Sequence, residues 1–476
     1  MNRREFLASA VGAALAPSLR PNIVYVFGDQ HRQSSWWGGD DPQVITPHLQ
    51  RMAREGALFQ HCLSNYPLCS PYRASLLTGR YGQANGVMKN MGGGQPGLPA
   101  TEVTIADVLK RAGYATGYVG KWHLDPGAGA GRLVPAGERR HGFDWWRVCH
   151  NYRNRYDTRS FDDDGKEFVL QGYAPKAQMD LTMEFIEKNA RQPFCVFLSW
   201  HPPHAPYAEA PQRFRDMYPA EKLKLRPNVP ADGDLKRIRE AYTGYFSHIT
   251  AQDEELGRLM KKLEQLGIAD NTIVCYSSDH GDMLGSFNLW AKQKPWEESI
   301  NVPFVVRWPK GIPGGQRLRT IFSTVDIAPT LLGLAGVAAP RGMQGADVAA
   351  ILRGQSGAGP ESAFLMARGS GSVEEDGDPA ALPRSRRDTK SARKAARKAG
   401  QKKAGAKNPG EWRGVRTARH TYARFQGGGA ARPWVLYDNE KDPYQMRNLV
   451  ADGAATGVRK DLDALVDEWR RRVGEV

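Results

Sequence analysis

The stretch NIVYVFGD, residues 22–29, is the segment of this chain that decides its class of fold. Its side chains are mostly large and apolar, without alternation between apolar and polar positions, which is typical of a strand covered on both faces. Three more runs of this kind end at polar residues: 114–121 (YATGYVGK), 194–200 (FCVFLSW) and 271–279 (NTIVCYSSD). The four runs predict the strands of one buried, mostly parallel sheet.

Helix-like stretches lie between these runs. They cover residues 47–56, 103–112, 178–190 and 241–266, and residues 302–308 and 325–334 add a further strand and helix. Such an alternation is typical of an α/β fold, in which helices cover both faces of the sheet. We therefore predict a large mixed, mostly parallel sheet sandwiched by helices, in a main domain over residues 21–354.

The character of the sequence changes after residue 354. Gly, Pro and charged residues become more frequent, residues 412–442 contain short strand-like runs joined by a Gly-rich turn, and residues 458–473 have the pattern of a closing helix. Short strands in succession favour antiparallel pairing. The pattern predicts a smaller C-terminal subdomain over residues 355–476, built from an antiparallel sheet and one helix.

The N-terminus has the pattern of an export signal. Arg3 and Arg4 precede a short apolar stretch at residues 7–15, which is too short to span a membrane. This arrangement predicts a twin-arginine-like signal over residues 1–20 and a periplasmic location. No later stretch is long and apolar enough to cross a bilayer, so no stable membrane insertion is expected.

The net charge of +15 suggests a nucleic-acid partner, but most of it lies in one segment. Residues 384–407 hold eleven Lys or Arg and one Asp, so this segment alone carries +10 and the rest of the chain +5. The segment has no aromatic residue and its like charges repel, which is typical of disorder. We expect a disordered basic insertion in the C-terminal subdomain and no nucleic-acid partner.

Polar and ionisable residues follow the ends of the four predicted strands. Each of them alone is ordinary, because an Asp in such a place more often caps a helix and a His more often packs in a loop. In open α/β sheets, however, ligands bind outside the carboxyl ends of the strands. The residues expected to gather at this edge are Asp29, Gln30, Lys121, His123, His201, His204, Asp279 and His280.

The segment LCSPYRASLLTGR, residues 68–80, adds a cysteine to this set. Pro71 suits a first helical turn, where its missing N–H costs little. Cys69 would then lie at a helix N-terminus, where the dipole and the free amides favour an anion. Arg73 offers a planar fork for oxyanions. The other cysteines have neither a disulfide-framework spacing nor a paired zinc spacing, and they are Cys62, Cys149, Cys195 and Cys275.

Taken together, these motifs resemble those of the sulfatase family, within the alkaline phosphatase superfamily. The resemblance extends from residue 22 to residue 448. It rests on Cys-x-Pro-x-Arg at 69–73 with Thr-Gly at 78–79, Gly-Lys-Trp-His at 120–123, Pro-His-Ala-Pro at 203–206 and Ser-Asp-His-Gly-Asp at 278–282. The motifs are specific in combination rather than singly. The resemblance implies hydrolysis of sulfate monoesters.

The resemblance further implies that a formylglycine-generating enzyme oxidises Cys69 to formylglycine (3-oxoalanine). The hydrated aldehyde can accept sulfate on one oxygen and expel it with the other, which divides one hard step into two easier steps. One divalent ion would be held by Asp29, Gln30, Asp279, His280 and an oxygen of modified Cys69. Mostly oxygen ligands favour Ca²⁺ or Mg²⁺, whereas Gln30 and His280 depart from the family's frequent Asp and Asn, and His280 favours Mn²⁺. We expect Ca²⁺.

The same resemblance implies the remaining roles. Arg73, Lys121 and Lys292 would bind the sulfate and the diol, and His123 would be the base that takes the second diol proton. His204 would face the leaving oxygen, with Lys292 as its partner or as a rival acid. The lysine two residues further along the chain is an alternative to Lys292.

Two other functions compete with this hypothesis. A phosphodiesterase or phosphonate monoester hydrolase uses the same scaffold, and Gln30 and His280 also occur in such relatives. A non-catalytic binder of sulfated polysaccharide would use the basic insertion, but it needs no intact Cys-x-Pro-x-Arg. The expected substrate is a sulfated carbohydrate, and the candidates for stacking on its sugar rings are Trp36, Trp37, Trp145 and Trp146.

Overall fold

The computed structural model describes residues 20–39, 41–92, 94–126, 133–149, 155–368, 410–426 and 430–476. The basic insertion at residues 384–407 lies outside these ranges, and so does the predicted export signal apart from its last residue. Among the described residues, no helix is both long enough and apolar enough to cross a membrane.

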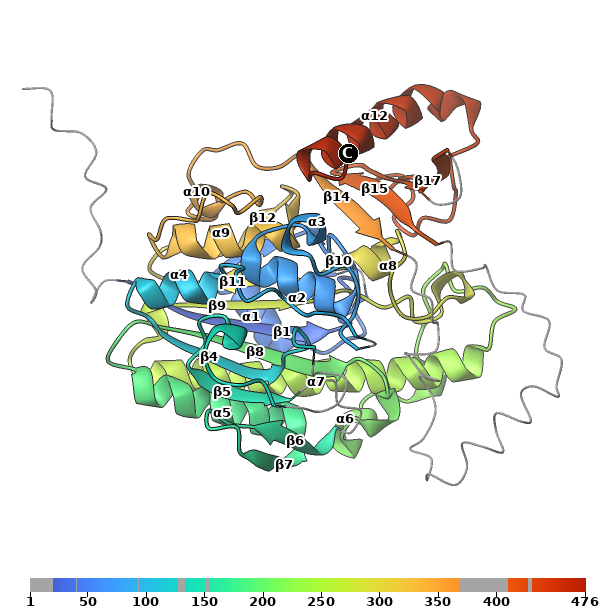
Figure 1. The fold of residues 1–476 in the computed structure, drawn as a ribbon. Coiled ribbons are helices and arrows are strands. Elements are labelled where there is room, and N and C mark those ends of the chain that lie inside the picture. Colours follow the sequence, from blue (N-terminus) through green and yellow to red (C-terminus); the bar gives the residue numbers. More distant parts are fainter. Residues whose placement is uncertain are drawn as a thin grey trace, which may run out of the picture.

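Ten strands of the described chain form one large sheet (Figure 1). The five central strands are mutually parallel, whereas both flanks include antiparallel pairs. The predicted mixed, mostly parallel sheet is therefore confirmed. The strand order is β12 (Gln316–Leu318), β2 (Ala57–Phe59), β11 (Val305–Arg307), β9 (Thr272–Ser278), β1 (Asn22–Asp29), β8 (Phe194–Pro203), β4 (Ala115–Lys121), β5 (Trp145–Cys149), β6 (Tyr156–Phe161) and β7 (Glu167–Tyr173).

Helices cover both faces of this sheet. Alternate side chains of β1 enter two different cores, with Tyr25 and Phe27 in one and Val24 and Val26 in the other. The first core is completed by α2 (Cys69–Thr78), α4 (Ile105–Arg111) and α9 (Thr324–Leu334), and the second by α1 (Pro47–Glu55), α5 (Ala174–Asn189) and α7 (Leu235–Gln265). This double cover explains why β1, β8 and β9 are buried at every position.

The single strand predicted at residues 302–308 is wrong, because the structure divides it between two sheets. Pro303 has no N–H to donate to a neighbouring strand, so the strand is interrupted there. The first piece, β10 (Asn301–Val302), pairs with β3 (Cys62–Leu63), which also pairs with β13 (Phe322–Ser323). The second piece is β11, which joins the large sheet beside β9.

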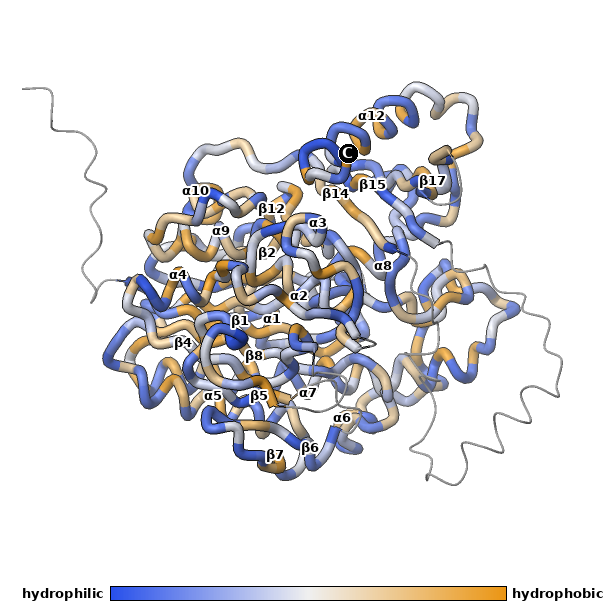
Figure 2. The backbone as a smooth tube through the Cα atoms, in the orientation of Figure 1, coloured by the Kyte–Doolittle hydropathy of each residue, from blue (hydrophilic) through white to orange (hydrophobic). Residues whose placement is uncertain are grey.

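The C-terminal part forms a four-stranded antiparallel sheet with one long helix, as predicted. Its strands are β14 (Ser362–Ala367), β15 (Trp412–Thr417), β16 (His420–Phe425) and β17 (Arg432–Asp438), and the helix is α12 (Thr456–Arg472). Figure 2 shows α12 with alternating hydrophilic and hydrophobic turns, and its buried Leu462, Val466 and Trp469 face the sheet core. The same core contains Met283 and Trp296, so the small sheet packs directly on the segment that follows β9.

Short helices connect the larger elements. They are α3 (Gly82–Asn85), α6 (Gln212–Arg215), α8 (Glu297–Ile300) and α10 (Ala349–Leu352).

Candidate active site

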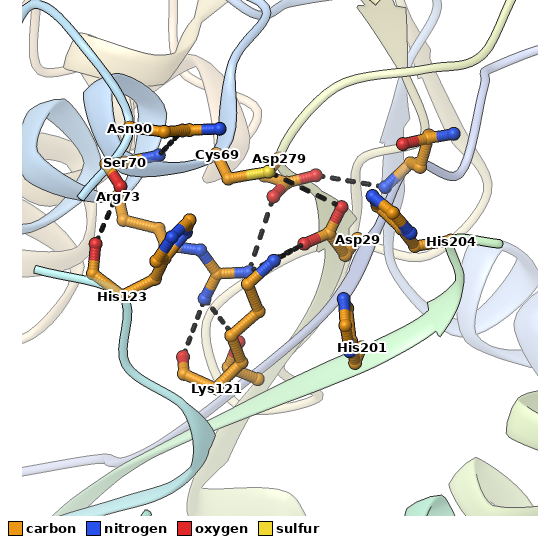
Figure 3. A network of polar contacts seen from close by, with 12 residues as sticks. Asp29, Cys69, Ser70, Arg73, Asn90, Lys121, His123, His201, His204 and Asp279 are labelled. Atoms are coloured by element: carbon orange, nitrogen blue, oxygen red, sulfur yellow. Dashed lines mark hydrogen bonds and ion pairs between the residues drawn. The ribbon is translucent and has the colours of Figure 1, made fainter. Parts of the chain in front are cut away.

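Four neighbouring strands carry the predicted site residues to one edge of the large sheet. Because β9, β1, β8 and β4 are adjacent and parallel, their carboxyl ends lie side by side. β1 ends at Asp29 and β4 at Lys121, His201 lies near the end of β8, and Asp279 directly follows β9. Figure 3 shows these side chains gathered around Cys69, which comes from α2.

Four fully buried side chains of this edge form a cluster that suits a cation. One potential ligand atom from each of Asp29, Cys69, Asp279 and His280 lies within 4.8 Å of the others. Burial lowers the pKa of His280, so its ring is neutral. Its Nδ1 lies 3.0 Å from the Gly281 carbonyl, which can only accept, so Nδ1 carries the proton and Nε2 turns its lone pair to the cluster. Two carboxylates and one imidazole lone pair fit a divalent ion.

Two cations neutralise these carboxylates. Lys121 Nζ lies 2.5 Å from Asp29 Oδ2, and Arg73 Nη2 lies 3.4 Å from Asp29 and 3.3 Å from Asp279. Burial alone would raise the pKa of Asp29, but the charge on Lys121 holds that pKa well below its usual range. Arg73 Nη1 donates to Ser199 Oγ at 2.5 Å and to the Lys121 carbonyl at 2.7 Å, which fixes the guanidinium. Cys69 therefore faces an ionised carboxylate and fixed positive charges.

Cys69 is the first residue of α2, as the sequence predicts. Pro71 lies in the first turn, and Gly79 ends the helix in the left-handed region at φ 61°, with its N–H bonded to the Ser75 carbonyl. Burial, followed by the charge on Asp29, raises the pKa of Cys69 to about 12. A thiol with this pKa is protonated at neutral pH, so the unmodified cysteine is a weak nucleophile here.

His123 lies two residues beyond β4, with a left-handed backbone at φ 57°, a conformation that few residues with a Cβ adopt. Burial, followed by the charges on Lys121 and Arg73, lowers the pKa of His123 well below its usual value, so the ring is neutral. Its Nδ1 is buried and has no hydrogen-bond partner within the described part of the chain. A neutral ring with an unused nitrogen is equipped to take a proton.

Lys292, the first of the two alternative lysines, lies at the site. Its Nζ is 3.1 Å from His204 Nε2 and 3.0 Å from Gln30 Oε1, and the residue is 4% exposed. His204 Nδ1 faces the Ala205 carbonyl at 2.8 Å, so Nδ1 carries the proton and Nε2 accepts from Lys292. The ammonium of Lys292 is therefore the proton donor of this pair. Lys294 is only half-buried.

Gln30 links Lys292 to the carboxylate cluster. Its backbone N–H donates to Asp279 Oδ1 at 3.0 Å, and its side-chain Nε2 donates to Asp282 Oδ2 at 2.5 Å. The amide orientation that this bond sets turns Oε1 to Lys292. The carbonyl oxygen expected to bind the metal thus contacts an ammonium group in this structure.

Sequence reasoning missed several buried residues that hold the site together. Ser64 Oγ donates to the Asp279 carbonyl at 2.6 Å, and Arg155 Nη1 donates to His201 Nδ1 at 3.0 Å. Asp282 is the last residue of the Ser-Asp-His-Gly-Asp motif at 278–282, so this motif could have identified it as a site residue. Ser64 and Arg155 lie in stretches without a recognisable pattern, and only the folded chain brings them to the site.

The four tryptophans proposed to stack on sugars do not form an exposed platform. Trp36 and Trp146 are fully buried in the two cores, which rules out contact with a ligand. Trp37 and Trp145 are half-buried beside the core on the α1, α5 and α7 face. The guanidinium of Arg147 lies 3.9 Å from the Trp145 ring centroid and occupies one face of it.

Comparison with known proteins matches both the sequence and the fold. The sulfatase family model matches residues 21–337. The ulvan-active sulfatase of Formosa agariphila is 35% identical over 465 residues, which cover 96% of this chain and 82% of that protein. A solved structure from work on the metabolism of multiple glycosaminoglycans by Bacteroides thetaiotaomicron is 27% identical, with a TM-score of 0.81, covering 96% of this chain and 97% of that chain.

A second solved structure shares the fold alone. The phosphonate monoester hydrolase of Agrobacterium radiobacter is 22% identical, with a TM-score of 0.71, and the match covers 95% of this chain and 96% of that chain.

Proposed function

The chain belongs to the sulfatase family, and we propose that this sulfuric ester hydrolase acts on sulfated carbohydrates through an oxidised Cys69 and one divalent metal ion. The observation that carries the proposal is the position of Cys69. It opens α2 and lies within 3.8 Å of Asp29 and 3.4 Å of His280, inside the cluster that fits a cation. Its high thiol pKa argues against catalysis by the unmodified side chain.

The oxidised residue would supply a hydrated aldehyde, whose two oxygens allow a covalent two-step hydrolysis. Arg73 and Lys121 are placed to hold the negative charge of the sulfate oxygens, because each is buried and fixed by hydrogen bonds. His123 is the base that takes the proton of the second diol oxygen, which lets the sulfated residue release sulfate. Lys292, bonded to His204, is the group that protonates the leaving oxygen.

The ion would be held by Asp29, Asp279 and His280 together with an oxygen of modified Cys69. A bound divalent cation acts as a Lewis acid that polarises the oxygens of the sulfate. The carboxylates dominate this ligand set, so we propose Ca²⁺, with Mg²⁺ or Mn²⁺ as alternatives. Gln30 would complete the set by turning Oε1 from Lys292 to the ion.

The substrate class and the location rest on the relatives. One relative is named for its activity on ulvan, and one neighbour comes from work on glycosaminoglycans, so we propose a sulfated polysaccharide or a fragment of one as the substrate. Long polymers of this kind remain outside the cell, which agrees with the predicted twin-arginine-like signal. We therefore propose that the protein is exported to the periplasm.

A phosphonate monoester hydrolase is the second candidate function, since the enzyme from Agrobacterium radiobacter shares the fold. Gln30 stands where the sulfatase family frequently has Asp, and His280 stands where it frequently has Asn. Both replacements also agree with that activity. The ratio of kcat/KM for an aryl sulfate to that for an aryl phosphonate monoester separates the two. A ratio far above one favours the sulfatase.

The nucleophile is tested by replacing Cys69. We expect Cys69→Ala to abolish aryl sulfate turnover while the thermal unfolding temperature changes little, because the substitution removes a few buried atoms. Cys195→Ala, another fully buried cysteine but in the sheet core, is the matched control and should retain turnover. Peptide mass spectrometry of the parent should find an aldehyde at position 69. Turnover by Cys69→Ala at the parent's rate would refute the proposal.

A further inference from the structure

Ser70 is the residue at which three parts of the site meet. It follows Cys69 in α2 and is fully buried. Its Oγ lies 2.7 Å from the carbonyl oxygen of His123 and 3.1 Å from the backbone nitrogen of Met91. Its own backbone N–H donates to Asn90 Oδ1 at 3.0 Å. Figure 3 shows Ser70 between Asn90 and His123, at the end of the helix that carries Cys69.

The chemistry of the partners fixes the direction of each bond. A carbonyl only accepts, so the hydroxyl of Ser70 donates its single proton to His123. A backbone N–H only donates, so the same hydroxyl accepts from Met91. With its proton committed to a carbonyl, Ser70 is not placed to transfer a proton to a substrate. Its contribution is to hold the residues around it.

His123 needs such support because of its backbone. A left-handed φ of 57° costs conformational energy for a residue with a Cβ, and such residues persist where their surroundings over-determine them. The bond from Ser70 reaches the carbonyl of this same strained residue. It therefore acts on the backbone torsions that set the direction of the imidazole.

We propose that Ser70 is a positioning residue, which ties the base His123 to the helix carrying Cys69 so that base and nucleophile keep one relative geometry. The inference rests on the proposed function, in which His123 takes the proton that allows sulfate to leave the enzyme. Ser70 itself touches neither the sulfate nor the ion. Its loss should slow the second half of the reaction more than the first.

The test compares Ser70→Ala with Ser247→Ala. Ser247 is also fully buried, and its hydroxyl donates within α7 to the Thr243 carbonyl at 2.5 Å. Ser70 occupies a variable position of Cys-x-Pro-x-Arg, so oxidation of Cys69 should proceed in the variant, and peptide mass spectrometry verifies it. We expect Ser70→Ala to lower kcat for an aryl sulfate about 10- to 100-fold, as losses of supporting hydrogen bonds do. Ser247→Ala should match the parent.

Further kinetic readouts separate positioning from general damage. If only the second step slows, KM falls together with kcat, and the first turnover releases aryl alcohol faster than the steady state. Ser70→Thr, which keeps the hydroxyl, should restore much of kcat. A loss of kcat/KM in proportion to kcat, without a burst, would overturn the proposal.

Asn90→Ala distinguishes support of His123 from capping of α2. This substitution removes the acceptor for the Ser70 N–H but leaves the bond to His123 intact. We expect a smaller effect on kcat and no burst. If Asn90→Ala reproduces the full effect of Ser70→Ala, the helix cap is what matters and the proposal fails.

A crystal structure of Ser70→Ala supplies a readout independent of turnover. We expect the backbone of His123 to leave the left-handed region, with a displaced imidazole. An unchanged His123 would overturn the proposal. The structural arm stays informative even if the parent hydrolyses no sulfate ester, an outcome that would count against the proposed function and not against the link between Ser70 and His123.

Discussion

At the scale of single residues, surroundings rather than residue type set the chemistry of this chain. The five cysteines are all buried, and none of them forms a disulfide within the described residues. Cys195 and Cys275 lie in the apolar core, where burial raises the pKa of both thiols and leaves them inert. Cys69 is equally buried, but carboxylates, an imidazole and two cations surround it. A modified side chain at this position has partners that the other cysteines lack.

The carboxylates predict how the enzyme responds to removal of the proposed metal ion. Chelation should inactivate it, and Asp279→Asn should weaken metal affinity about 10- to 100-fold or more, since one of two charged ligands becomes neutral. Isothermal titration of the demetallated protein measures the affinity directly. Asp270→Asn, a carboxylate near the opposite end of β9, is the control and should bind metal normally. Full activity after exhaustive demetallation would exclude a catalytic ion.

Lys292 and His204 predict a dependence on the leaving group. Because Lys292 Nζ donates to His204, we expect Lys292→Ala to slow esters of alkyl alcohols, which need protonation, far more than esters of nitrophenols, which do not. A difference of about 100-fold between the two substrate types is within the range of general acid catalysis. Lys294→Ala should affect both substrates equally. An equal loss on both substrates in Lys292→Ala would assign Lys292 to sulfate binding instead.

At the scale of elements, the sequence predicted the inner strands well because each contains a mainly apolar run that polar residues follow. β1 has the predicted bounds, β4 begins one residue later, β9 is one residue shorter at each end, and β8 extends three residues further than predicted. α5 and α7 begin earlier than predicted, since Pro175 in the first turn and the cap at Asp234 extend them beyond their apolar pattern. The strands β5 to β7, on one flank of the sheet, were missed. β6 and β7 bury less surface than the central strands, so their sequences carry a weaker apolar signal.

The candidate site was predictable to the same extent as the strands that carry it. Asp29, Lys121 and Asp279 fall at strand ends, so parallel pairing alone brings them together. Arg155 and Asn90 belong to loops whose paths depend on packing across the whole domain. No local pattern encodes those paths, and these residues became visible only through their hydrogen bonds.

The contact between α7 and α1 predicts a pH effect on stability. Asp253 of α7 accepts from the backbone nitrogens of His48 and Leu49 at 2.9 and 2.7 Å, capping the start of α1. Burial outweighs these bonds and raises the pKa of Asp253 from 3.8 to about 7. Between these two values the folded protein keeps a proton that the unfolded chain has lost, so the free energy of unfolding falls as pH rises through this window.

The measurement is urea unfolding at pH 5 and pH 8 in the parent and in Asp253→Asn. In the parent, the free energy of unfolding should fall by a few kcal/mol between pH 5 and pH 8 because of Asp253. We expect Asp253→Asn to remove this fall, because an amide does not titrate in this range. At pH 5, where Asp253 is protonated in the folded protein, the variant should have a lower free energy of unfolding than the parent. At pH 8 the difference between the two free energies should be smaller. Parallel pH profiles for the two proteins would mean that Asp253 does not titrate in this window.

At the scale of the whole molecule, the basic insertion at residues 384–407 belongs to the connection between β14 and β15. Ala367 at the end of β14 and Trp412 at the start of β15 are paired neighbours, so the chain leaves and re-enters the small sheet at adjacent points. None of the proposed site residues lies between them. A hairpin of this kind tolerates a change in the length of its connection, because the entropy of loop closure varies slowly with length.

Deletion of residues 384–407 should therefore leave the unfolding temperature and aryl sulfate turnover almost unchanged. On a long sulfated polymer the deletion variant should lose, at most, an advantage that salt removes, since exposed charges are screened over about 8 Å at physiological ionic strength. Calorimetry and rates at low and high salt measure both effects. A large fall in the unfolding temperature would show that this segment contributes to the folded core.

The contact between the small sheet and the segment after β9 also has a consequence for the order of folding during synthesis of the chain. Trp412 Nε1 donates to the Gln293 carbonyl at 3.1 Å, and Trp296 Nε1 donates to Tyr437 OH at 3.1 Å, so late-synthesised strands anchor the segment that directly follows Lys292. A ribosome that has completed the large sheet has not yet made these anchors. A nascent chain halted at residue 354 should hold Lys292 loosely and release little aryl alcohol, even with Cys69 already oxidised. The anchoring thus predicts that the cleavage activity depends on completion of the small sheet.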